Sequence, residues 1–157
     1  MKRTIQVSLI SLVISAIVFP VNGCISQSGV RDAEAAGAPF FIHASMGIPD
    51  SAGGRAITFA FRNLGSNDIK YVDIETRFYN QVGDVVQCSY GYNDRVRFTG
   101  PIGVNQTETG SPPKCYDMAR SKLTIYNVVI TYMDDSEEGY TIDELAQVKA
   151  VHQNNLP

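Results

Sequence analysis

Hydrophobic and polar residues alternate along most of the chain after residue 39, and this alternation is typical of half-buried β-strands. Ile57, Phe59 and Phe61 share one face of the segment 57–62. Two further inward rows are Val72, Ile74 and Phe78, with Thr76 among them, and Tyr126, Val128, Ile130 and Tyr132. Since side chains alternate between the two sides of a strand, each row predicts a buried face opposite a solvated one. Shorter strands are predicted at 40–46, 85–90 and 95–99.

Clusters of turn-forming residues separate these segments. They are Leu64–Asp68, Asn80–Asp84 and Asp134–Gly139. Only Ile142–Val151 has helical spacing, with Asp143 as its N-cap. Several short strands with regularly spaced turns predict an all-β fold. We therefore expect an antiparallel β-sandwich domain over residues 39–157 that carries a short C-terminal helix.

Particular stretches of this domain also resemble a known family. Phe59-Ala60-Phe61-Arg62-Asn63, Ile69-Lys70-Tyr71-Val72 and the run from Arg77 to Asp84 resemble the FxLYD-type domain, an immunoglobulin-like β-sandwich of bacterial envelope and lipoprotein sequences. The segments 99–102 and 130–134 match the same kind of domain, so the resemblance covers residues 56–135. At the motif itself Thr76 replaces Phe, Phe78 replaces Leu and Asn80 replaces Asp. The resemblance implies an immunoglobulin-like module and does not imply an activity.

The first 23 residues have the features of an export signal. Lys2 and Arg3 precede an apolar run from residue 5 to 19, which would span roughly 22 Å as a helix, less than the ~30 Å hydrocarbon core of a bilayer. A signal peptide therefore fits better than a permanent transmembrane helix. Val21 and Gly23 before Cys24 resemble the lipobox of bacterial lipoproteins, although Asn22 departs from it. This resemblance implies cleavage before Cys24 and lipidation of its sulfur; the alternative is ordinary cleavage that leaves a free or dimerising thiol.

The segment that follows the cleavage site contains small and polar residues. Residues 24–38 are predicted to be a lipidated cysteine with a flexible tether, because they carry too little apolar surface to offset the entropy of ordering. The alternative is a short helix over 31–36 that ends at Gly37. Ile25 stands where an Asp tends to retain lipoproteins in the inner membrane, so the outer membrane is favoured in a host that has one.

The remaining cysteines are predicted to pair. Cys88 and Cys115 would lie in an oxidising compartment, where two such thiols usually form a disulfide. Metal binding is the alternative, but these two cysteines with only His43 and His152 lack the spacing of a metal site. The sequence predicts no metal and no cofactor.

Charge and motifs exclude some classes of function. The 157 residues carry 13 basic and 16 acidic side chains, a net charge of −3, and removal of Lys2 and Arg3 with the signal makes it −5. Nucleic-acid binding is not expected of an acidic chain. No motif of a hydrolase is present, and a lone strand histidine such as His43 is usually structural. The acidic run 134–138 could bind Ca²⁺, but it lacks the order of an EF-hand loop and more simply forms a solvated turn.

One segment has the composition of a recognition loop. Tyr90, Tyr92 and Asn93 lie in the Ser-, Gly- and Tyr-rich stretch 88–94, and tyrosine offers a large contact area at small entropic cost. The alternative is that Tyr90 and Tyr92 pack on the sheet. We expect a lipid-anchored, non-enzymatic module outside the cytosol that contacts an envelope protein or glycan. The second hypothesis is a secreted or anchored inhibitor or ligand-binding protein that uses the loop 88–94.

Overall fold

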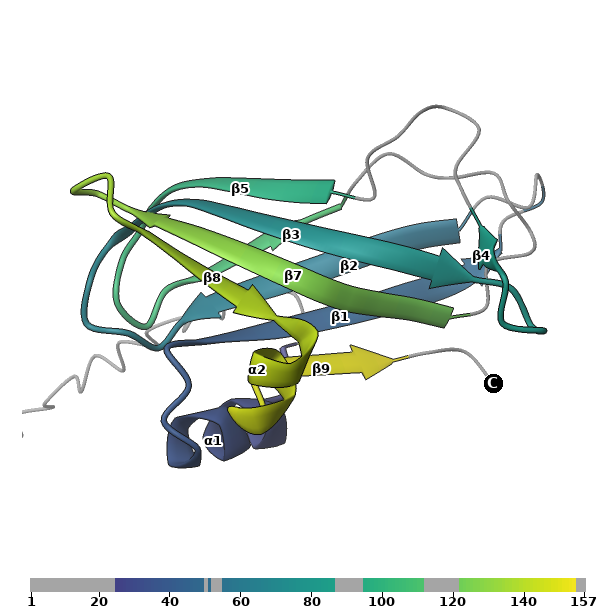
Figure 1. Cartoon of the computed structure of the whole chain (residues 1–157), viewed down its shortest axis with the longest axis horizontal. Coiled ribbons are helices and arrows are strands. Elements are labelled where there is room, and N and C mark those ends of the chain that lie inside the picture. Colours follow the sequence, from purple (N-terminus) through teal and green to yellow (C-terminus); the bar gives the residue numbers. More distant parts are fainter. Residues whose placement is uncertain (1–24, 50, 52–54, 87–94, 112–121, 155–157) are drawn as a thin grey trace, which may run out of the picture.

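The chain folds into two β-sheets packed face to face. In the computed structural model, the described residues are 25–49, 51, 55–86, 95–111 and 122–154. The first sheet has the order β6-β2-β1-β9 and the second has the order β4-β3-β7-β8, with β5 also paired to β3 (Figure 1). The strands are β1 (Phe40–Pro49), β2 (Arg55–Asn63), β3 (Ile69–Tyr79), β4 (Val85–Val86), β5 (Arg95–Ile102), β6 (Thr107–Gly110), β7 (Lys122–Tyr132), β8 (Glu137–Thr141) and β9 (Val151–Asn154). The predicted β-sandwich is confirmed.

The core lies between the two sheets and contains the predicted inward rows. Phe59, Phe61, Val72 and Ile74 have no exposed surface. Phe61 lies between the two aromatic rings of Phe40 and Phe98, at 5.6 Å and 6.2 Å between ring centroids. Full burial of one such side chain contributes about 1.5–3 kcal/mol, so these rows supply much of the drive to fold.

The inward row of β7 differs from the prediction. Val128 and Ile130 are buried as expected. Leu123 and Ile125 are also buried, although in an unbroken strand they would point to the opposite face from Val128 and Ile130. A register shift where β7 pairs with Glu75 and Thr76 of β3 places one extra residue in β7 at this point. Such a bulge exchanges the faces of the strand, so the prediction that Tyr126 points inward was wrong. Its ring lies beneath the guanidinium of Arg77, which is exposed.

Residues 27–35 form a helix rather than part of a flexible tether. α1 (Gln27–Ala35) buries Val30 and Ala33 in the core, so the flexible-tether prediction was wrong for this segment. The cause is Phe41, whose side chain points away from the inter-sheet core and would be exposed without a cover. A Cβ on Gly29 would lie 2.5 Å from the ring of Phe41, which shows how closely α1 covers it. The helix ends at Gly37, at φ +74°, as the helical alternative expected.

The C-terminal segment is helical over a shorter range than predicted. α2 (Ile142–Gln147) is capped by Thr141 rather than Asp143, and the carboxylate of Glu144 accepts hydrogen bonds from the backbone N–H and hydroxyl of Thr141. Lys149, at φ 52°, has the left-handed backbone conformation that follows the end of many helices. Glycine is the usual residue at such a position, so the sequence did not indicate where this helix ends. The chain continues as β9, which pairs with β1 in parallel; every other described strand pair is antiparallel.

Both helices lie along one long edge of the sandwich in Figure 1. Within the described part of the chain, neither helix has the length and apolar character needed to cross a membrane. The helices instead cover the sandwich, since Leu145 of α2 belongs to the same buried cluster as Val30 of α1.

Candidate binding face

The residues predicted to bind or to be modified lie outside the described residues. These are Cys24, Cys88, Cys115, Tyr90, Tyr92 and Asn93. Four of them fall between Val86 of β4 and Arg95 of β5, and both of these strands pair with the same partner, β3.

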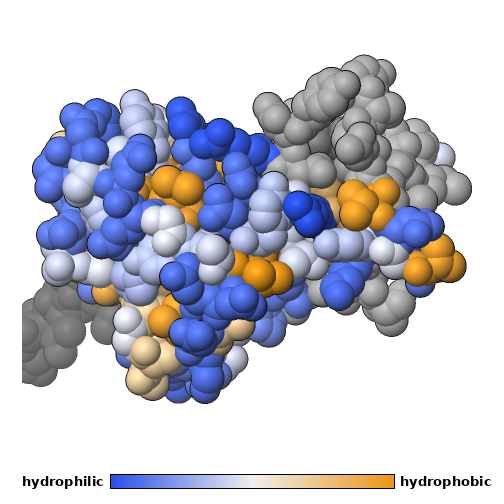
Figure 2. All heavy atoms as spheres, in the orientation of Figure 1, coloured by the Kyte–Doolittle hydropathy of each residue, from blue (hydrophilic) through white to orange (hydrophobic). Residues whose placement is uncertain are grey.

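We call the solvated side of the second sheet the outer face. Its members include Tyr71, Asp73, Glu75, Arg77 and Tyr79 of β3, Arg95, Arg97 and Thr99 of β5, Lys122, Thr124, Tyr126, Asn127, Val129 and Thr131 of β7, and Glu137, Gly139 and Thr141 of β8. Figure 2 is viewed onto this side and shows a mostly hydrophilic surface with separate hydrophobic patches. The ionised groups in this set are four cations and three carboxylates, a net charge of +1, on a chain whose overall charge is −3. The outer face is thus slightly basic on an acidic protein.

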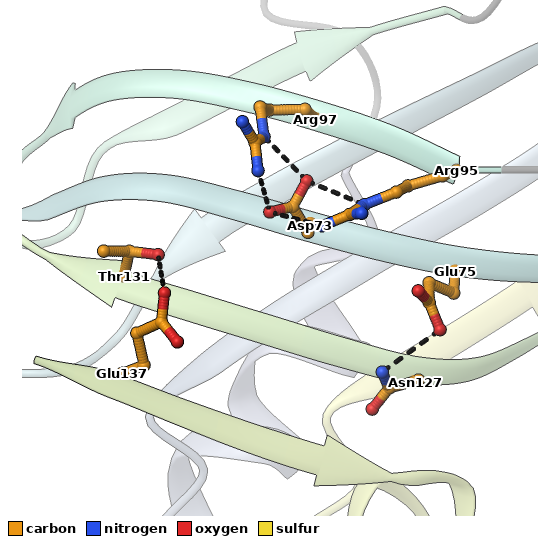
Figure 3. A network of polar contacts seen from close by, with 7 residues as sticks. All are labelled: Asp73, Glu75, Arg95, Arg97, Asn127, Thr131 and Glu137. Atoms are coloured by element: carbon orange, nitrogen blue, oxygen red, sulfur yellow. Dashed lines mark hydrogen bonds and ion pairs between the residues drawn. The ribbon is translucent and has the colours of Figure 1, made fainter. Parts of the chain in front are cut away.

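A carboxylate held between two arginines occupies one edge of the outer face. Arg97 donates through Nε to Oδ1 of Asp73 at 2.8 Å and through Nη2 to Oδ2 at 2.7 Å (Figure 3). Arg95 donates through Nε to Oδ1 at 3.1 Å, and its Nη2 lies 3.0 Å from Oδ2. The Asp73 side chain is only 5% exposed, whereas the Arg95 and Arg97 side chains are 46% and 54% exposed. We call these three residues the arginine clamp.

The register of the sheet produces the clamp. Asp73 lies directly opposite Arg97 in the β3–β5 pair, and Arg95 lies two residues along β5 on the same side. Burial alone would raise the pKa of Asp73, but hydrogen bonds from Arg97 and then Arg95, together with their charges, hold that pKa below its ordinary value. The carboxylate therefore stays ionised at neutral pH and fixes both guanidinium groups. Asp73 alternates with Val72 and Ile74, which predicts a solvated position, and no local pattern in the sequence indicates this pairing.

Cations lie over the tyrosine rings of the outer face. The guanidinium carbon of Arg97 is 5.1 Å from the ring centroid of Tyr71, and that of Arg77 is 4.5 Å from the ring centroid of Tyr126. Such contacts are worth about 0.5–1 kcal/mol when exposed. Their main effect is on the conformation of the arginines, because each ring holds a long cationic side chain close to the sheet. The guanidinium groups of Arg77 and Arg97 consequently lie over the rings of Tyr126 and Tyr71.

Acidic side chains interrupt the cationic layer. Glu75 accepts a hydrogen bond from Asn127 at 3.2 Å, and Glu137 accepts one from Thr131 at 3.4 Å (Figure 3). Positive and negative groups therefore alternate across the strands instead of forming a uniform field. A surface of this kind discriminates between partners by the position of their charges.

The acidic run 134–138 forms the hairpin between β7 and β8. Asp135 has φ 65°, and Asp134 accepts hydrogen bonds from the backbone and hydroxyl of Ser136 at 3.0 Å and 2.6 Å. These are contacts of a tight turn, as the simpler interpretation of the sequence expected. An open depression of about 530 Å³ adjoins the hairpin and is lined by Ser66, Asn67, Asp68, Tyr132, Met133 and Asp134. No group of three or more His, Cys, Asp or Glu side chains suited to a metal ion occurs in the described ranges.

The two histidines, far apart in the sequence, meet on the first sheet. His43 of β1 and His152 of β9 are directly paired, and their rings stack at 5.3 Å between centroids. Burial and then the nearby charge of His152 lower the pKa of His43. The sequence analysis treated each histidine as isolated because β9 was not predicted.

Comparisons with known proteins give distant structural similarity and nothing at the level of sequence. No family model matches the chain, and no curated protein matches it. Among solved structures, IrmA from Escherichia coli is similar at 9% identity and a TM-score of 0.47, over 73% of this chain and 92% of that one. A DUF1425 family member from Shewanella is similar at 10% identity and a TM-score of 0.42, over 55% of this chain and 74% of that one. These similarities are too distant to support an argument about function.

Proposed function

We propose that this protein is a lipid-anchored, non-catalytic β-sandwich module that acts outside the cytosol and contacts another envelope component through its outer face. The observation that carries the proposal is the arginine clamp, which holds two half-exposed arginines in fixed positions on an otherwise acidic chain. Arginine and tyrosine are the residues most enriched where protein interfaces gain their affinity. We further propose that the domain is of the FxLYD immunoglobulin-like type, on the motif residues between Phe59 and Asp84.

A binding role is better supported than a catalytic one. Glu75 and Glu137 on the outer face accept hydrogen bonds from Asn127 and Thr131, and the buried carboxylate of Asp73 is already saturated by guanidinium donors. A general base needs a free lone pair within reach of a substrate proton. Asp73 does not offer one, so its arrangement suits fixing the arginines rather than proton transfer.

The outer face can be tested with site-specific photo-crosslinkers in cells. We expect a crosslinker at Tyr126 to capture a defined envelope component, and the Arg77→Ala variant to reduce the yield. A crosslinker at Asp32 on α1 is the control and should not capture it. Equal capture from Tyr126 and Asp32, or no dependence on Arg77, would contradict the proposal.

The lipid anchor is tested at Cys24. We expect Cys24→Ser to move the protein from the membrane fraction to the soluble fraction, because the acyl chains supply the membrane affinity and the mature body, with net charge −5, does not. Membrane retention of this variant would refute lipidation. For the proposed disulfide, mass mapping without reduction should link the peptides of Cys88 and Cys115, and free thiols at both positions would refute it.

The second candidate is an inhibitor or ligand-binding protein that uses the loop 88–94. It is favoured by the composition of this segment, which is rich in Ser, Gly and Tyr, and by its place in the chain between β4 and β5, two strands that pair with β3. The double variant Tyr90→Ala/Tyr92→Ala separates the two candidates. If this double variant loses a binding partner while the crosslinker at Tyr126 still captures its envelope component, the loop acts independently of the outer face.

A further inference from the structure

We infer that the arginine clamp is a recognition site for a carboxylate side chain on an acidic segment of a protein partner. The inference rests on the proposed function and specifies the chemistry of the partner. It follows from the unused donors of the two arginines, the charge pattern around them and the glycine at the far end of their row across the sheet.

The clamp leaves hydrogen-bond donors available to solvent. A guanidinium group has five N–H donors. Arg97 uses Nε and Nη2 on Asp73, and Arg95 uses the same two nitrogens. Both carboxylate oxygens of Asp73 are saturated by these contacts, while each arginine keeps about three N–H groups. The two guanidinium groups share the carboxylate of Asp73, and Glu137 also attracts Arg97 electrostatically.

The arginines are held in position before any ligand arrives. Asp73 binds the inner edge of Arg97, and Tyr71 lies under its plane at 5.1 Å. An exposed arginine normally loses rotamer entropy when it binds, and prior ordering removes much of that cost. The outer edge of the same group is free to engage a second carboxylate in the two-bond geometry that it already forms with Asp73.

The charge pattern favours a polypeptide over a uniform polyanion. Glu75 and Glu137 lie on the same outer face and would repel a phosphate-rich or sulfate-rich polymer laid across it. A polypeptide can place acidic residues at the clamp and amide or basic residues over Glu75 and Glu137. Fixed charges of both signs therefore select a protein whose charges are complementary in position.

The far end of the clamp's row across the sheet carries no side chain. This row runs from Arg97 through Asp73 and Val129 to Gly139 on β8. A Cβ built on Gly139 would meet no atom within 4 Å. A main chain can therefore lie close to the sheet at β8 while its side chains extend along the row towards the clamp.

The experiment uses the full-length protein in a neutral detergent. The probe is a fluorescent copolymer of glutamate and lysine with glutamate in excess, which offers carboxylates to the clamp and basic residues to Glu75 and Glu137. We expect Arg97→Gln to weaken binding by about tenfold, in line with the loss of a two-bond guanidinium–carboxylate contact. Arg97→Lys keeps the charge but loses the planar fork, so it should weaken binding to a similar extent. Arg31→Gln makes the same charge change on the exposed surface of α1 and should change affinity less than twofold. Arg95→Gln gives a second variant if Arg97→Gln does not fold.

Several results would overturn the inference. Equal weakening by Arg31→Gln and Arg97→Gln would show attraction by net charge alone. Full binding by Arg97→Lys would show that the fork is not used. Tighter binding of dextran sulfate with the same dependence on Arg97 would identify a polyanion site instead.

The outcome is also separable from that of the crosslinking test. If the glutamate–lysine copolymer does not bind while capture at Tyr126 persists, the inference fails and the proposed function stands. If the copolymer binds through Arg97 while capture fails, the carboxylate site stands and the proposed function fails.

Discussion

The arginine clamp gives a quantitative prediction about stability. Asp73→Asn replaces a buried carboxylate that makes four contacts with guanidinium nitrogens, at 2.7 to 3.1 Å. The substituted amide has no charge, and its NH₂ group can only face the arginine donors. At least two of the four contacts are therefore lost, and water cannot replace them because the Asp73 side chain is 5% exposed.

The size of the effect lies between two known limits. Removing one partner of a fully buried ion pair costs about 3–5 kcal/mol, whereas an exposed pair is worth about 0–1 kcal/mol. Asp73 is buried but Arg95 and Arg97 are half exposed, so both arginines can turn outward and be solvated. We expect Asp73→Asn to lower the free energy of unfolding by about 2–3 kcal/mol at pH 7.

The pH dependence provides an independent check. The pKa of Asp73 is lowered in the folded protein, so the folded state favours the ionised form. Its stabilising effect is complete above the unfolded-state pKa of about 3.9 and is lost as the pH falls through the lower, folded-state pKa. The difference between wild type and Asp73→Asn should therefore begin to shrink near pH 5 and continue to shrink on further acidification.

Urea unfolding followed by circular dichroism measures both quantities. Asp32→Asn, on the exposed surface of α1, is the matched control and should change stability by less than about 0.5 kcal/mol. The reasoning is refuted if Asp73→Asn is as stable as the control at pH 7. It is also refuted if the difference from wild type is unchanged across the acid range.

Three further predictions test other parts of the structure. Gly100→Ala should destabilise the fold by about 3 kcal/mol or prevent folding, because its Cβ would overlap a backbone carbonyl oxygen of β3. Gly139→Ala is the control and should be nearly neutral, since a Cβ there meets no atom; thermal unfolding of both variants measures the difference in stability. In an NMR titration His43 should have a pKa below the ordinary histidine value of about 6.5. His152→Ala should raise the pKa of His43 only part of the way to that value, because burial is the larger cause of the shift. A return of the pKa of His43 to the ordinary value in this variant would contradict the prediction. Val30→Ala should cost about 1–2 kcal/mol in urea unfolding if α1 is part of the core, and nothing if the segment is a free tether.

The sequence predicted the elements whose burial pattern is local. Alternation at Ile57, Phe59 and Phe61 and at Val72 and Ile74 was enough to predict strands and their inward faces, because side-chain direction in a strand has a period of two. Turns at 64–68, 80–84 and 134–139 were likewise visible from residue types that tolerate tight backbone geometry. These features led directly to the β-sandwich.

Other features carried a signal that was missed. The run Phe40-Phe41-Ile42 is apolar on both sides of a strand, and a strand of this kind needs a cover on its second side. That cover is α1, which the composition of residues 24–38 concealed. The change of parity between Ile125 and Val128 similarly indicates a bulge, and it explains why Tyr126 faces outward.

The candidate site depended on the tertiary structure alone. Asp73 and Arg97 are 24 residues apart, and His43 and His152 are farther still along the chain, so their pairing follows from which strands are neighbours and in which register. A shift of one residue would turn the side chains of a strand to its other face. The sequence by itself determined that the chain forms a sandwich and which side chains are buried in the strands that alternate without a bulge. Only strand order and register decided which charges meet, because contacts between distant strands are not encoded in any local pattern.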